Sequence, residues 1–433
     1  MDRISIVGGK PLHGAIPISG AKNATLPLMI ASLLTKDTLI LDNVPRLADV
    51  SQLQRILNNH GVDIMVNGKR PGDTAYQGQT LHISAANIVD TTAPYELVSK
   101  MRASFWVIGP LVARMGEAKV SMPGGCAIGT RPVDLLIMAL QGLGAEIEID
   151  GGYVIARARN GLRGGEIVFP KVTVGGTHTA LMAASLAHGT SVIENAAREP
   201  EIVALADFLN AAGARISGQG STEITAQGVA FLRPVEFENI PDRIEAGTYL
   251  AAAAITGGNV TLRKVRPDHL SLVLDRLREM GVGIAVEGNA ITVTPPASGR
   301  LRAIDVTTQP YPGFPTDLQA QFMALLCVAE GSGVITDTIY TDRFAHVPEL
   351  QRLGAEIRLR LNVASVRGRE RLQGASVTST DIRASSALVL AGLVARGETL
   401  VHRVYHIDRG YEAIEKRLRS LGAEITRFSA PGP

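Results

Sequence analysis

The sequence predicts an α/β protein of two similar domains, in which apolar helices form the centre and sheets lie outside. Three observations lead to this prediction: a short motif occurs six times, each copy joins a helix pattern to a strand pattern, and each repeat also holds a second, almost wholly apolar helix. The length of 433 residues also favours two domains, because a single hydrophobic core rarely serves a chain of that size.

The repeated motif is Leu-Gly-Ala-Glu-Ile or a variant of it. Its copies begin at residues 60, 143, 212, 280, 353 and 421. The spacing of about 70 residues is longer than that of solenoid repeats, so each copy is expected to be a supersecondary unit of several elements. The six units divide into three and three.

Each copy of the motif ends a helix and begins a strand. Ahead of the first copy, Val50, Leu53 and Leu57 recur at helical spacing. The glycine of the motif is the expected left-handed residue just past the helix. After it, apolar and charged residues alternate, as over residues 355–361, and this alternation predicts a half-buried strand.

The second helix of each unit has almost no polar face, and such helices are normally buried. The seam between the two groups of three units is expected near residues 238–242, where the fourth unit begins. A cleft between two similar domains is a common place for a ligand. The six apolar helices are expected at residues 24–34, 104–113, 179–187, 249–255, 318–329 and 385–395.

Composition limits the classes of function. The chain has 43 Lys and Arg against 41 Asp and Glu, a net charge of +2, which predicts no bulk attraction to nucleic acid or to an anionic membrane. Two cysteines argue against a disulfide framework. The N-terminus lacks an apolar signal segment, and the apolar run at 26–34 is too short to span a bilayer. These features predict a cytoplasmic protein.

Cys126 lies in a segment, residues 123–132, that is too rich in Gly and Pro for the interior of a helix or strand. Glycines let the backbone approach a ligand closely, and Arg131 nearby gives the setting of a reactive thiol. The alternative is that Cys126 is a small buried hydrophobe, as free cysteines usually are. Cys327 lies in an apolar helical run and is expected to be part of the core.

An arginine precedes each helix that ends at a repeated glycine. A cation at this end opposes the helix dipole, so its recurrence needs a reason. Helix N-termini bind anions through free N–H groups, and an adjacent arginine would complete a carboxylate or phosphate site. The alternative, preferred for most of the six, is pairing with a nearby carboxylate. The arginines are Arg46, Arg131, Arg198, Arg266, Arg343 and Arg409, and the neighbouring carboxylates are Asp49, Asp134, Glu199, Asp268, Asp342 and Asp408.

Other charged residues also stand at expected helix starts. Lys22 follows a glycine-containing segment at the entry to an apolar helix and suggests an anion contact, although any helix entry can carry a lysine. Asp317 ends a segment with two prolines, and it is either a simple helix-start charge or a deliberately positioned carboxylate. Arg102 and Arg383 occupy equivalent places in two units, with Asp381 just ahead of the second, and either arginine could be structural.

Six segments together resemble the UDP-N-acetylglucosamine 1-carboxyvinyltransferase family, and the resemblance covers nearly the entire chain. The motifs are long and occur in the right order, so the combined signal is specific although each fragment alone is weak. Members of this family transfer the enolpyruvyl group of phosphoenolpyruvate to the 3-hydroxyl of UDP-N-acetylglucosamine and release phosphate, the first committed step of peptidoglycan synthesis. The segments are residues 19–23 (Ser-Gly-Ala-Lys-Asn), 101–104 (Met-Arg-Ala-Ser), 123–134, 194–201, 314–317 (Phe-Pro-Thr-Asp) and 406–411 (His-Ile-Asp-Arg-Gly-Tyr).

The resemblance implies a fold of two domains, each an inside-out α/β barrel of three βαβαββ units, with the active site in the cleft between them. The first domain is then residues 23–240, which carry the Cys126 segment, and the second is residues 1–22 together with 241–433. No metal or organic cofactor is implied. The implied partners are UDP-N-acetylglucosamine and phosphoenolpyruvate, with neither nucleic acid nor membrane.

The resemblance also implies roles for individual residues. Lys22, Arg131 and Arg409 are similar to the cations around phosphoenolpyruvate. Cys126 resembles the proton donor to its C3, and Asp317 the group that takes the proton of the sugar hydroxyl. Asp381 and Arg383 resemble further active-site residues. The implied nucleotide-sugar contacts are Asn23, Arg102, Arg131, Pro132, Val133, Asp134, Leu135, Lys171, Val172, Thr173, Val174 and Ile339.

These residue types suit the chemistry. Phosphoenolpyruvate carries a carboxylate and a phosphate, so a net-neutral protein needs several fixed cations to bind it. Addition across its double bond requires an acid at C3 and a base at the attacking hydroxyl. The first alternative is 3-phosphoshikimate 1-carboxyvinyltransferase, whose pattern lacks the cysteine segment. The second is a paralogue that binds nucleotide sugar without turnover, for which loss of Cys126, Asp317 or Arg409 would be expected.

Overall fold

The computed structural model describes residues 2–67, 78–123 and 133–429. These residues form two compact units. The N-terminal unit comprises the described residues between Gly20 and Ile240, and the C-terminal unit comprises residues 2–19 together with 241–429. The division assigns residues 20–22 to the N-terminal unit, whereas the bounds expected from the sequence group them with the second domain.

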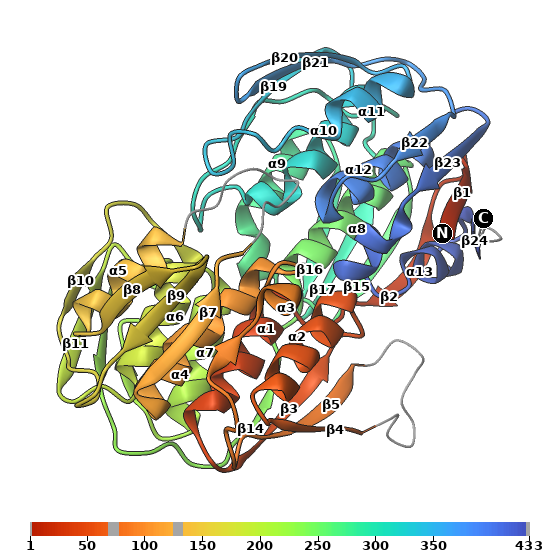
Figure 1. Cartoon of the computed structure of the whole chain (residues 1–433). Helices are drawn as coiled ribbons and strands as arrows, with labels where there is room; N and C mark the ends of the chain where they lie inside the picture. Colours follow the sequence, from red (N-terminus) through yellow and green to blue (C-terminus); the bar gives the residue numbers. More distant parts are fainter. Residues whose placement is uncertain (1, 68–77, 124–132, 430–433) are drawn as a thin grey trace. The chain divides into compact units, whose positions relative to one another are not determined.

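Each unit holds three four-stranded sheets (Figure 1). In every sheet, one outer strand runs parallel to its neighbour and the remaining pairs are antiparallel. In the N-terminal unit the sheets are, in spatial order, β14 (Glu236–Glu238), β3 (Thr38–Val44), β5 (Gln79–Ser84) and β4 (Asp63–Asn67); β6 (Thr92–Ala93), β7 (Glu117–Ser121), β9 (Tyr153–Arg157) and β8 (Glu146–Asp150); and β10 (Glu166–Val168), β11 (Thr190–Glu194), β13 (Glu223–Gln227) and β12 (Arg215–Ser217). In the C-terminal unit they are β16 (Gly283–Glu287), β17 (Ala290–Thr294), β15 (Asn259–Arg263) and β2 (His13–Pro17); β18 (Val306–Thr307), β19 (Ser332–Thr336), β21 (Val363–Arg367) and β20 (Glu356–Arg360); and β22 (Ser376–Thr378), β23 (Glu398–His402), β1 (Asp2–Val7) and β24 (Glu424–Ser429).

The first and fourth repeats exchange their first strands. Strand β2 precedes the first apolar helix, yet it pairs with β15 of the fourth repeat. Strand β14 precedes the helix of the fourth repeat, yet it pairs with β3 of the first repeat. Strand β1 lies between β23 and β24 and so completes the sheet of the sixth repeat. Each sheet therefore contains four strands, although in the first and fourth repeats one strand comes from a distant part of the chain.

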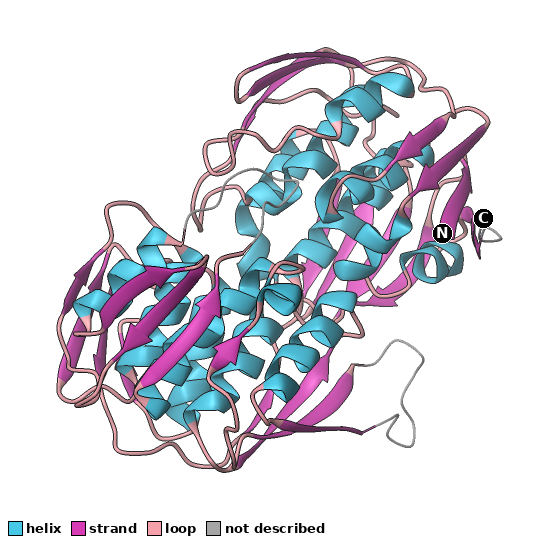
Figure 2. Cartoon of the chain, in the orientation of Figure 1, coloured by secondary structure: helices cyan, strands magenta, loops and turns pink. Residues whose placement is uncertain are grey.

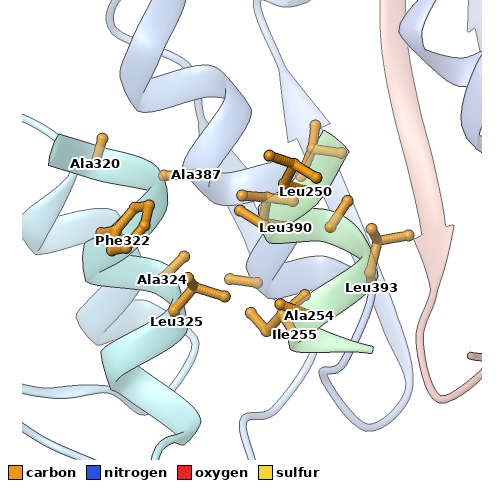
Figure 3. Packing of buried hydrophobic residues seen from close by; sticks show 14 of the residues in the cluster. Leu250, Ala254, Ile255, Ala320, Phe322, Ala324, Leu325, Ala387, Leu390 and Leu393 are labelled. Carbon is orange, nitrogen blue, oxygen red and sulfur yellow. The ribbon is translucent and has the colours of Figure 1, made fainter. Parts of the chain in front are cut away.

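The apolar helices form the centre of each unit, with the sheets outside them (Figure 2). All thirteen residues of α8 and all eleven of α12 are buried, as the absence of a polar face predicted. Side chains of α8, α10 and α12, such as Leu250, Phe322 and Leu390, pack together (Figure 3). The central elements are α1 (Lys22–Ile30) with η1 (Ala31–Leu34), η2 (Arg102–Val107) with α4 (Ile108–Met115), and α6 (Val174–Ala184) in the N-terminal unit, and α8 (Arg243–Ile255), α10 (Gln319–Val328) and α12 (Ile382–Gly392) in the C-terminal unit.

The other helices are more amphipathic or short. Several of them end at the glycines of the repeated motif, whose φ angles lie between 84° and 101°, so the predicted left-handed helix stops are confirmed. Those glycines are Gly61, Gly144, Gly213, Gly281, Gly354 and Gly422. The helices are α2 (Ala48–Asn59), α3 (Tyr95–Val98), α5 (Asp134–Gly142), α7 (Pro200–Ala211), α9 (Ser271–Glu279), α11 (Val347–Arg352), α13 (Ile414–Ser420), η3 (Pro267–Leu270), η4 (Thr316–Leu318) and η5 (Val404–Arg409).

Candidate active site

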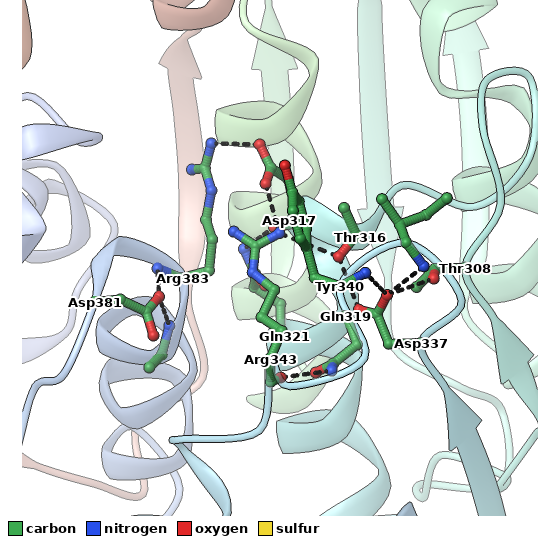
Figure 4. A network of polar contacts seen from close by, with 12 residues as sticks. Thr308, Thr316, Asp317, Gln319, Gln321, Asp337, Tyr340, Arg343, Asp381 and Arg383 are labelled. Carbon is green, nitrogen blue, oxygen red and sulfur yellow. Dashed lines mark hydrogen bonds and ion pairs between the residues drawn. The ribbon is translucent and has the colours of Figure 1, made fainter. Parts of the chain in front are cut away.

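Asp317 is the centre of a polar network in the C-terminal unit (Figure 4). Its carboxylate accepts a hydrogen bond from Arg343 Nη1 at 2.8 Å and another from Arg383 Nη2 at 3.0 Å. The side chains of Arg343 and Arg383 are 7% and 4% exposed, whereas that of Asp317 is 22% exposed. Two largely buried guanidinium groups thus bind a carboxylate that still reaches the surface.

The start of a central helix positions Asp317. Residue Pro315 precedes the 3-10 turn η4, which runs directly into the buried helix α10. The Thr316 hydroxyl donates to Asp337 Oδ2 at 2.7 Å and accepts from Arg343 Nη1 at 3.1 Å. The backbone of Asp317 is therefore fixed by its neighbours as well as by its own ion pairs.

Asp337 fixes the segment that carries Ile339. Its Oδ1 accepts hydrogen bonds from the Thr308 hydroxyl and from the N–H groups of Ile339 and Tyr340, at 2.8, 3.0 and 2.8 Å. The side chain of Ile339 remains partly exposed. The predicted nucleotide-sugar contact Ile339 therefore lies in the segment between Asp337 and Arg343, whose two end residues both belong to the Asp317 network.

Arg383 lies in the first turn of α12 and links Asp317 to Tyr411. Asp381 is the N-cap of this helix: its Oδ1 accepts from the N–H groups of Arg383 and Ala384 at 2.8 and 3.0 Å. Arg383 Nη1 donates to the Tyr411 hydroxyl at 3.2 Å. Burial alone would lower the pKa of Arg383, but Asp317 and Tyr411 hold it above the ordinary arginine value.

Arg409 ends η5 and is half-buried. Two residues later, the Tyr411 hydroxyl lies 2.9 Å from the Thr248 hydroxyl and accepts from Gln321 Nε2 at 3.3 Å. The structure therefore brings Asp317, Arg383 and the segment following Arg409 into one hydrogen-bonded system.

The remaining predicted site residues lie in the N-terminal unit, and several of them open its central helices. Lys22 is the first residue of α1, and its Nζ lies 2.8 Å from Asp49 Oδ2 in an ion pair that is almost fully buried. Asn23 follows in the same turn and is half-buried, and Arg102 is the first residue of η2. Asp317 and Arg383 lie at the corresponding ends of central helices in the other unit, so both units place charged groups at helix starts.

Two further groups of predicted contacts stand at helix starts in this unit. Val133, Asp134 and Leu135 form the entry to α5, where Asp134 is exposed. Thr173 is the N-cap of α6, and its hydroxyl accepts from Gly176 N at 3.1 Å. The segment before this cap contains the exposed Lys171 and the half-buried Val172, and Val174 begins the helix. Cys126, Arg131 and Pro132 lie outside the described residues.

The expected pairing with a neighbouring carboxylate is wrong for Arg343 and confirmed for Arg266. Arg343 pairs with Asp317 rather than with the adjacent Asp342, because the chain folds the start of α10 against Arg343. Asp49, the expected neighbour of Arg46, forms an ion pair with Lys22. The expectation holds for Arg266, which forms two hydrogen bonds with Asp268.

Sequence reasoning missed three functional candidates. Arg343 was identified only as one of six repeated arginines, and Asp337 and Tyr411 were not singled out as network members. Arg343 carried the signal of the repeated arginines, and Tyr411 ends the segment 406–411 that contributed to the family resemblance. Cys327 matches its prediction: it is fully buried, and burial raises the pKa of its thiol to about 12.

Within residues 2–67, 78–123 and 133–429, no three His, Cys, Asp or Glu side chains cluster in a way that could hold a metal ion. None of the helices in that part of the chain has both the length and the apolar character that a membrane span requires.

Comparison with known proteins identifies the family. The sequence matches the EPSP synthase (3-phosphoshikimate 1-carboxyvinyltransferase) family over residues 6–418. Among curated relatives, UDP-N-acetylglucosamine 1-carboxyvinyltransferase of Methylobacterium nodulans is 64% identical over 427 residues, 99% of each chain. The enzyme of the same name from Nitrobacter winogradskyi is 64% identical over 430 residues, 99% of this chain and 100% of the relative.

Solved structures show the same fold. The enolpyruvyl transferase NikO from Streptomyces tendae superimposes with a TM-score of 0.86 at 24% identity and covers 99% of both chains. EPSP synthase from Acinetobacter baumannii gives a TM-score of 0.73 at 18% identity, covering 99% of this chain and 100% of its own. The family match, together with this fold, places the chain among the enolpyruvyl transferases. Within that class, the chain belongs to the UDP-N-acetylglucosamine 1-carboxyvinyltransferase family.

Proposed function

We propose that this enzyme transfers the enolpyruvyl group of phosphoenolpyruvate to the 3-hydroxyl of UDP-N-acetylglucosamine and releases phosphate, in the cytoplasm, as the first committed step of peptidoglycan synthesis. The observation that carries the proposal is the Asp317 carboxylate held by two largely buried arginines. This arrangement offers a fixed carboxylate as the base that addition of the sugar hydroxyl to phosphoenolpyruvate requires.

The cations divide the task of binding phosphoenolpyruvate. Lys22, Arg131 and Arg409 bind its phosphate and carboxylate groups. Lys22 suits this role because its ammonium group is already desolvated beside Asp49, so an incoming anion finds a fixed partner. The proposed nucleotide-sugar contacts are Asn23, Arg102, the segments 131–135 and 171–174, and Ile339, and Asp381 and Arg383 are further proposed active-site residues.

Asp317 and Cys126 provide the base and the acid. Asp317 takes the proton of the sugar 3-hydroxyl as that oxygen attacks C2 of phosphoenolpyruvate, and Cys126 gives a proton to C3. The ion pairs to Arg343 and Arg383 hold this carboxylate in place for that step. Loss of a proton from C3 together with departure of phosphate from C2 then restores the double bond in the product.

Phosphate release tests the reaction. The enzyme is incubated with phosphoenolpyruvate and either UDP-N-acetylglucosamine or shikimate 3-phosphate, and inorganic phosphate is measured. Phosphate release with UDP-N-acetylglucosamine as the acceptor, and not with shikimate 3-phosphate, supports the proposal. Release only with shikimate 3-phosphate would identify the other branch of the family, and nucleotide-sugar binding without release would identify a non-catalytic paralogue.

Alkylation tests the role of Cys126. Fosfomycin resembles phosphoenolpyruvate and carries an epoxide that a thiolate opens, so we expect mass spectrometry to find its adduct on Cys126. Cys327 is the internal control, because its buried thiol has a raised pKa and should not react. In Cys126→Asp, a carboxyl can donate the same proton, so turnover should continue while fosfomycin no longer inhibits. An adduct on Cys327 alone would contradict the assignment.

A further inference from the structure

Arg427 binds the carboxylate of Asp408, the residue that precedes Arg409. Neither the sequence motifs nor the proposed reaction gives Arg427 a role. It lies in β24, and its Nη1 and Nη2 donate to Asp408 Oδ1 and Oδ2 at 2.6 and 2.7 Å. These two parallel hydrogen bonds, called the fork below, fix the orientation of the guanidinium group relative to the carboxylate as well as the distance between them. Both carboxylate oxygens of Asp408 are thus used by Arg427, although the sequence suggested Asp408 as a partner for Arg409.

The fork is itself anchored to the first strand of the C-terminal unit. Arg427 Nε donates to Asp2 Oδ2 at 2.9 Å, and Asp2 Oδ1 accepts from the Ser429 hydroxyl at 2.8 Å. Strands β1 and β24 pair along their length, with Arg427 opposite Ile4. The guanidinium group of Arg427 is therefore held by a carboxylate on the sheet while it holds a carboxylate on η5.

The other side of Arg409 is fixed as well. Gly410 passes so close to α12 that a Cβ atom there would lie 2.5 Å from Ile382 Cγ2. Tyr411 is buried, and its hydroxyl contacts Thr248 and Arg383. Arg409 thus stands between Asp408, which is fixed to the sheet, and a Gly410–Tyr411 pair fixed to the Asp317 network.

The backbone entering this segment adopts a costly conformation. Arg403, immediately ahead of η5, has a φ of 55°, in the left-handed region that a non-glycine residue rarely adopts. Such a conformation persists where the surrounding contacts determine it. The Arg427–Asp408 fork is the charged contact that ties the far end of η5 to the sheet.

We propose that Arg427 is a positioning residue for Arg409: through Asp408 it sets the place of η5, and thereby the place at which the Arg409 guanidinium meets phosphoenolpyruvate. The inference rests on the proposed function, in which Arg409 binds that substrate. A misplaced binding group weakens catalysis even when its chemistry is intact. Arg427 itself touches no reacting atom.

The test compares steady-state kinetics of Arg427→Met and Arg427→Lys with the wild-type enzyme. Methionine removes every donor, and lysine keeps the charge but loses the fork. We expect both variants to raise KM for phosphoenolpyruvate about tenfold while KM for UDP-N-acetylglucosamine stays within about twofold. Asp408→Asn should give the same pattern and replaces the Arg427 variants if they fail to fold.

Arg266 supplies a matched control. Its Nε and Nη2 form the same kind of fork with Asp268, at 3.0 and 2.7 Å, in the same compact unit. Arg266→Met should leave both KM values unchanged. An equal rise in KM for phosphoenolpyruvate in Arg266→Met would show a general effect of removing surface charge and would overturn the inference.

A double-mutant cycle separates the inference from the proposed function on which it rests. If Arg427 acts through Arg409, adding Arg427→Met to Arg409→Ala should cost nothing more. Effects that add, or wild-type kinetics in Arg427→Met while Arg409→Ala is impaired, would overturn the positioning role and leave the proposed function standing. Wild-type kinetics in Arg409→Ala would instead overturn the role of Arg409, and the inference with it.

Discussion

Arg266 and Arg343 stand at matching places in two neighbouring repeats, each just ahead of a helix. Arg266 pairs with Asp268 two residues later, and 48% of its side chain is exposed. Arg343 is 7% exposed and pairs with Asp317, 26 residues earlier in the chain. The difference teaches that burial and long-range contact, rather than position in the repeat, decide whether such an arginine is a surface charge or part of a site.

The largest expected effect comes from replacing Asp317, the carboxylate that pairs with the buried Arg343. In Asp317→Asn the base is lost, so we expect turnover to fall by about 10²–10⁴-fold. Arg343 and Arg383 also lose their shared negative charge, which should lower the free energy of unfolding by about 3–5 kcal/mol. Phosphate release and urea unfolding measure the two effects. Asp268→Asn is the control, and turnover near the wild-type value in Asp317→Asn would remove Asp317 from the mechanism.

Arg343→Met breaks the Arg343–Asp317 ion pair by removing the arginine instead of the carboxylate. The substitution leaves Asp317 with Arg383 and removes the bond from Arg343 to Thr316. We expect the free energy of unfolding to fall by about 3 kcal/mol, the lower end of the range for breaking a buried pair, because Asp317 keeps one partner. Urea unfolding provides the measurement. A loss no larger than that of Arg266→Met would mean that burial does not distinguish the two arginines.

His178 extends the comparison to a buried group without a charged partner. It lies in α6, is fully buried against Trp106, and burial lowers the pKa of its ring to about 3. The unfolded chain therefore binds a proton more readily than the folded one between pH 6.5 and 3, so stability falls as the pH falls through that window. The loss due to His178 should reach roughly 2–3 kcal/mol at pH 4.5.

Replacement of His178 should flatten this pH dependence. We expect the free energy of unfolding of His178→Gln to change less between pH 7 and 4.5 than that of the wild type, as measured by urea unfolding at each pH. His188→Gln, which removes an exposed histidine a few residues later, is the matched control. Parallel curves for His178→Gln and wild type would show that His178 does not carry the acid sensitivity.

The exposed member of the comparison should show the smallest effect. Arg266→Met breaks a fork whose two side chains are 48% and 61% exposed. Such pairs are worth at most about 1 kcal/mol and weaken as salt screens them. Thermal melting at low and high salt measures this, with the difference between variant and wild type expected to shrink at high salt. A loss of several kcal/mol would place Arg266 in the same class as Arg343.

Much of the local architecture could be predicted from the sequence. Gly61 and Gly354 end helices with the left-handed angles that the repeat indicated, and α8 and α12 are buried as their lack of a polar face required. These features follow from short-range rules, because a helix stop or an apolar surface depends on residues within a few positions. Lys22, Asp317 and Arg383 were also found as helix-start charges, although their partners were not.

The partners and the strand exchange were decided by the tertiary structure. Arg343 meets Asp317 because the segments that precede α11 and α10 lie close together in the fold. Strands β2 and β14 each join a sheet of the other's repeat because the chain passes from one unit to the other just after each of these strands. Arg427 reaches Asp408 only because β24 pairs beside β1. Such contacts join residues far apart in the chain, so no local pattern encodes them. The sequence by itself determined the repeats, their buried helices and the kinds of charge at the helix starts; the packing of whole repeats decided which of those charges face one another.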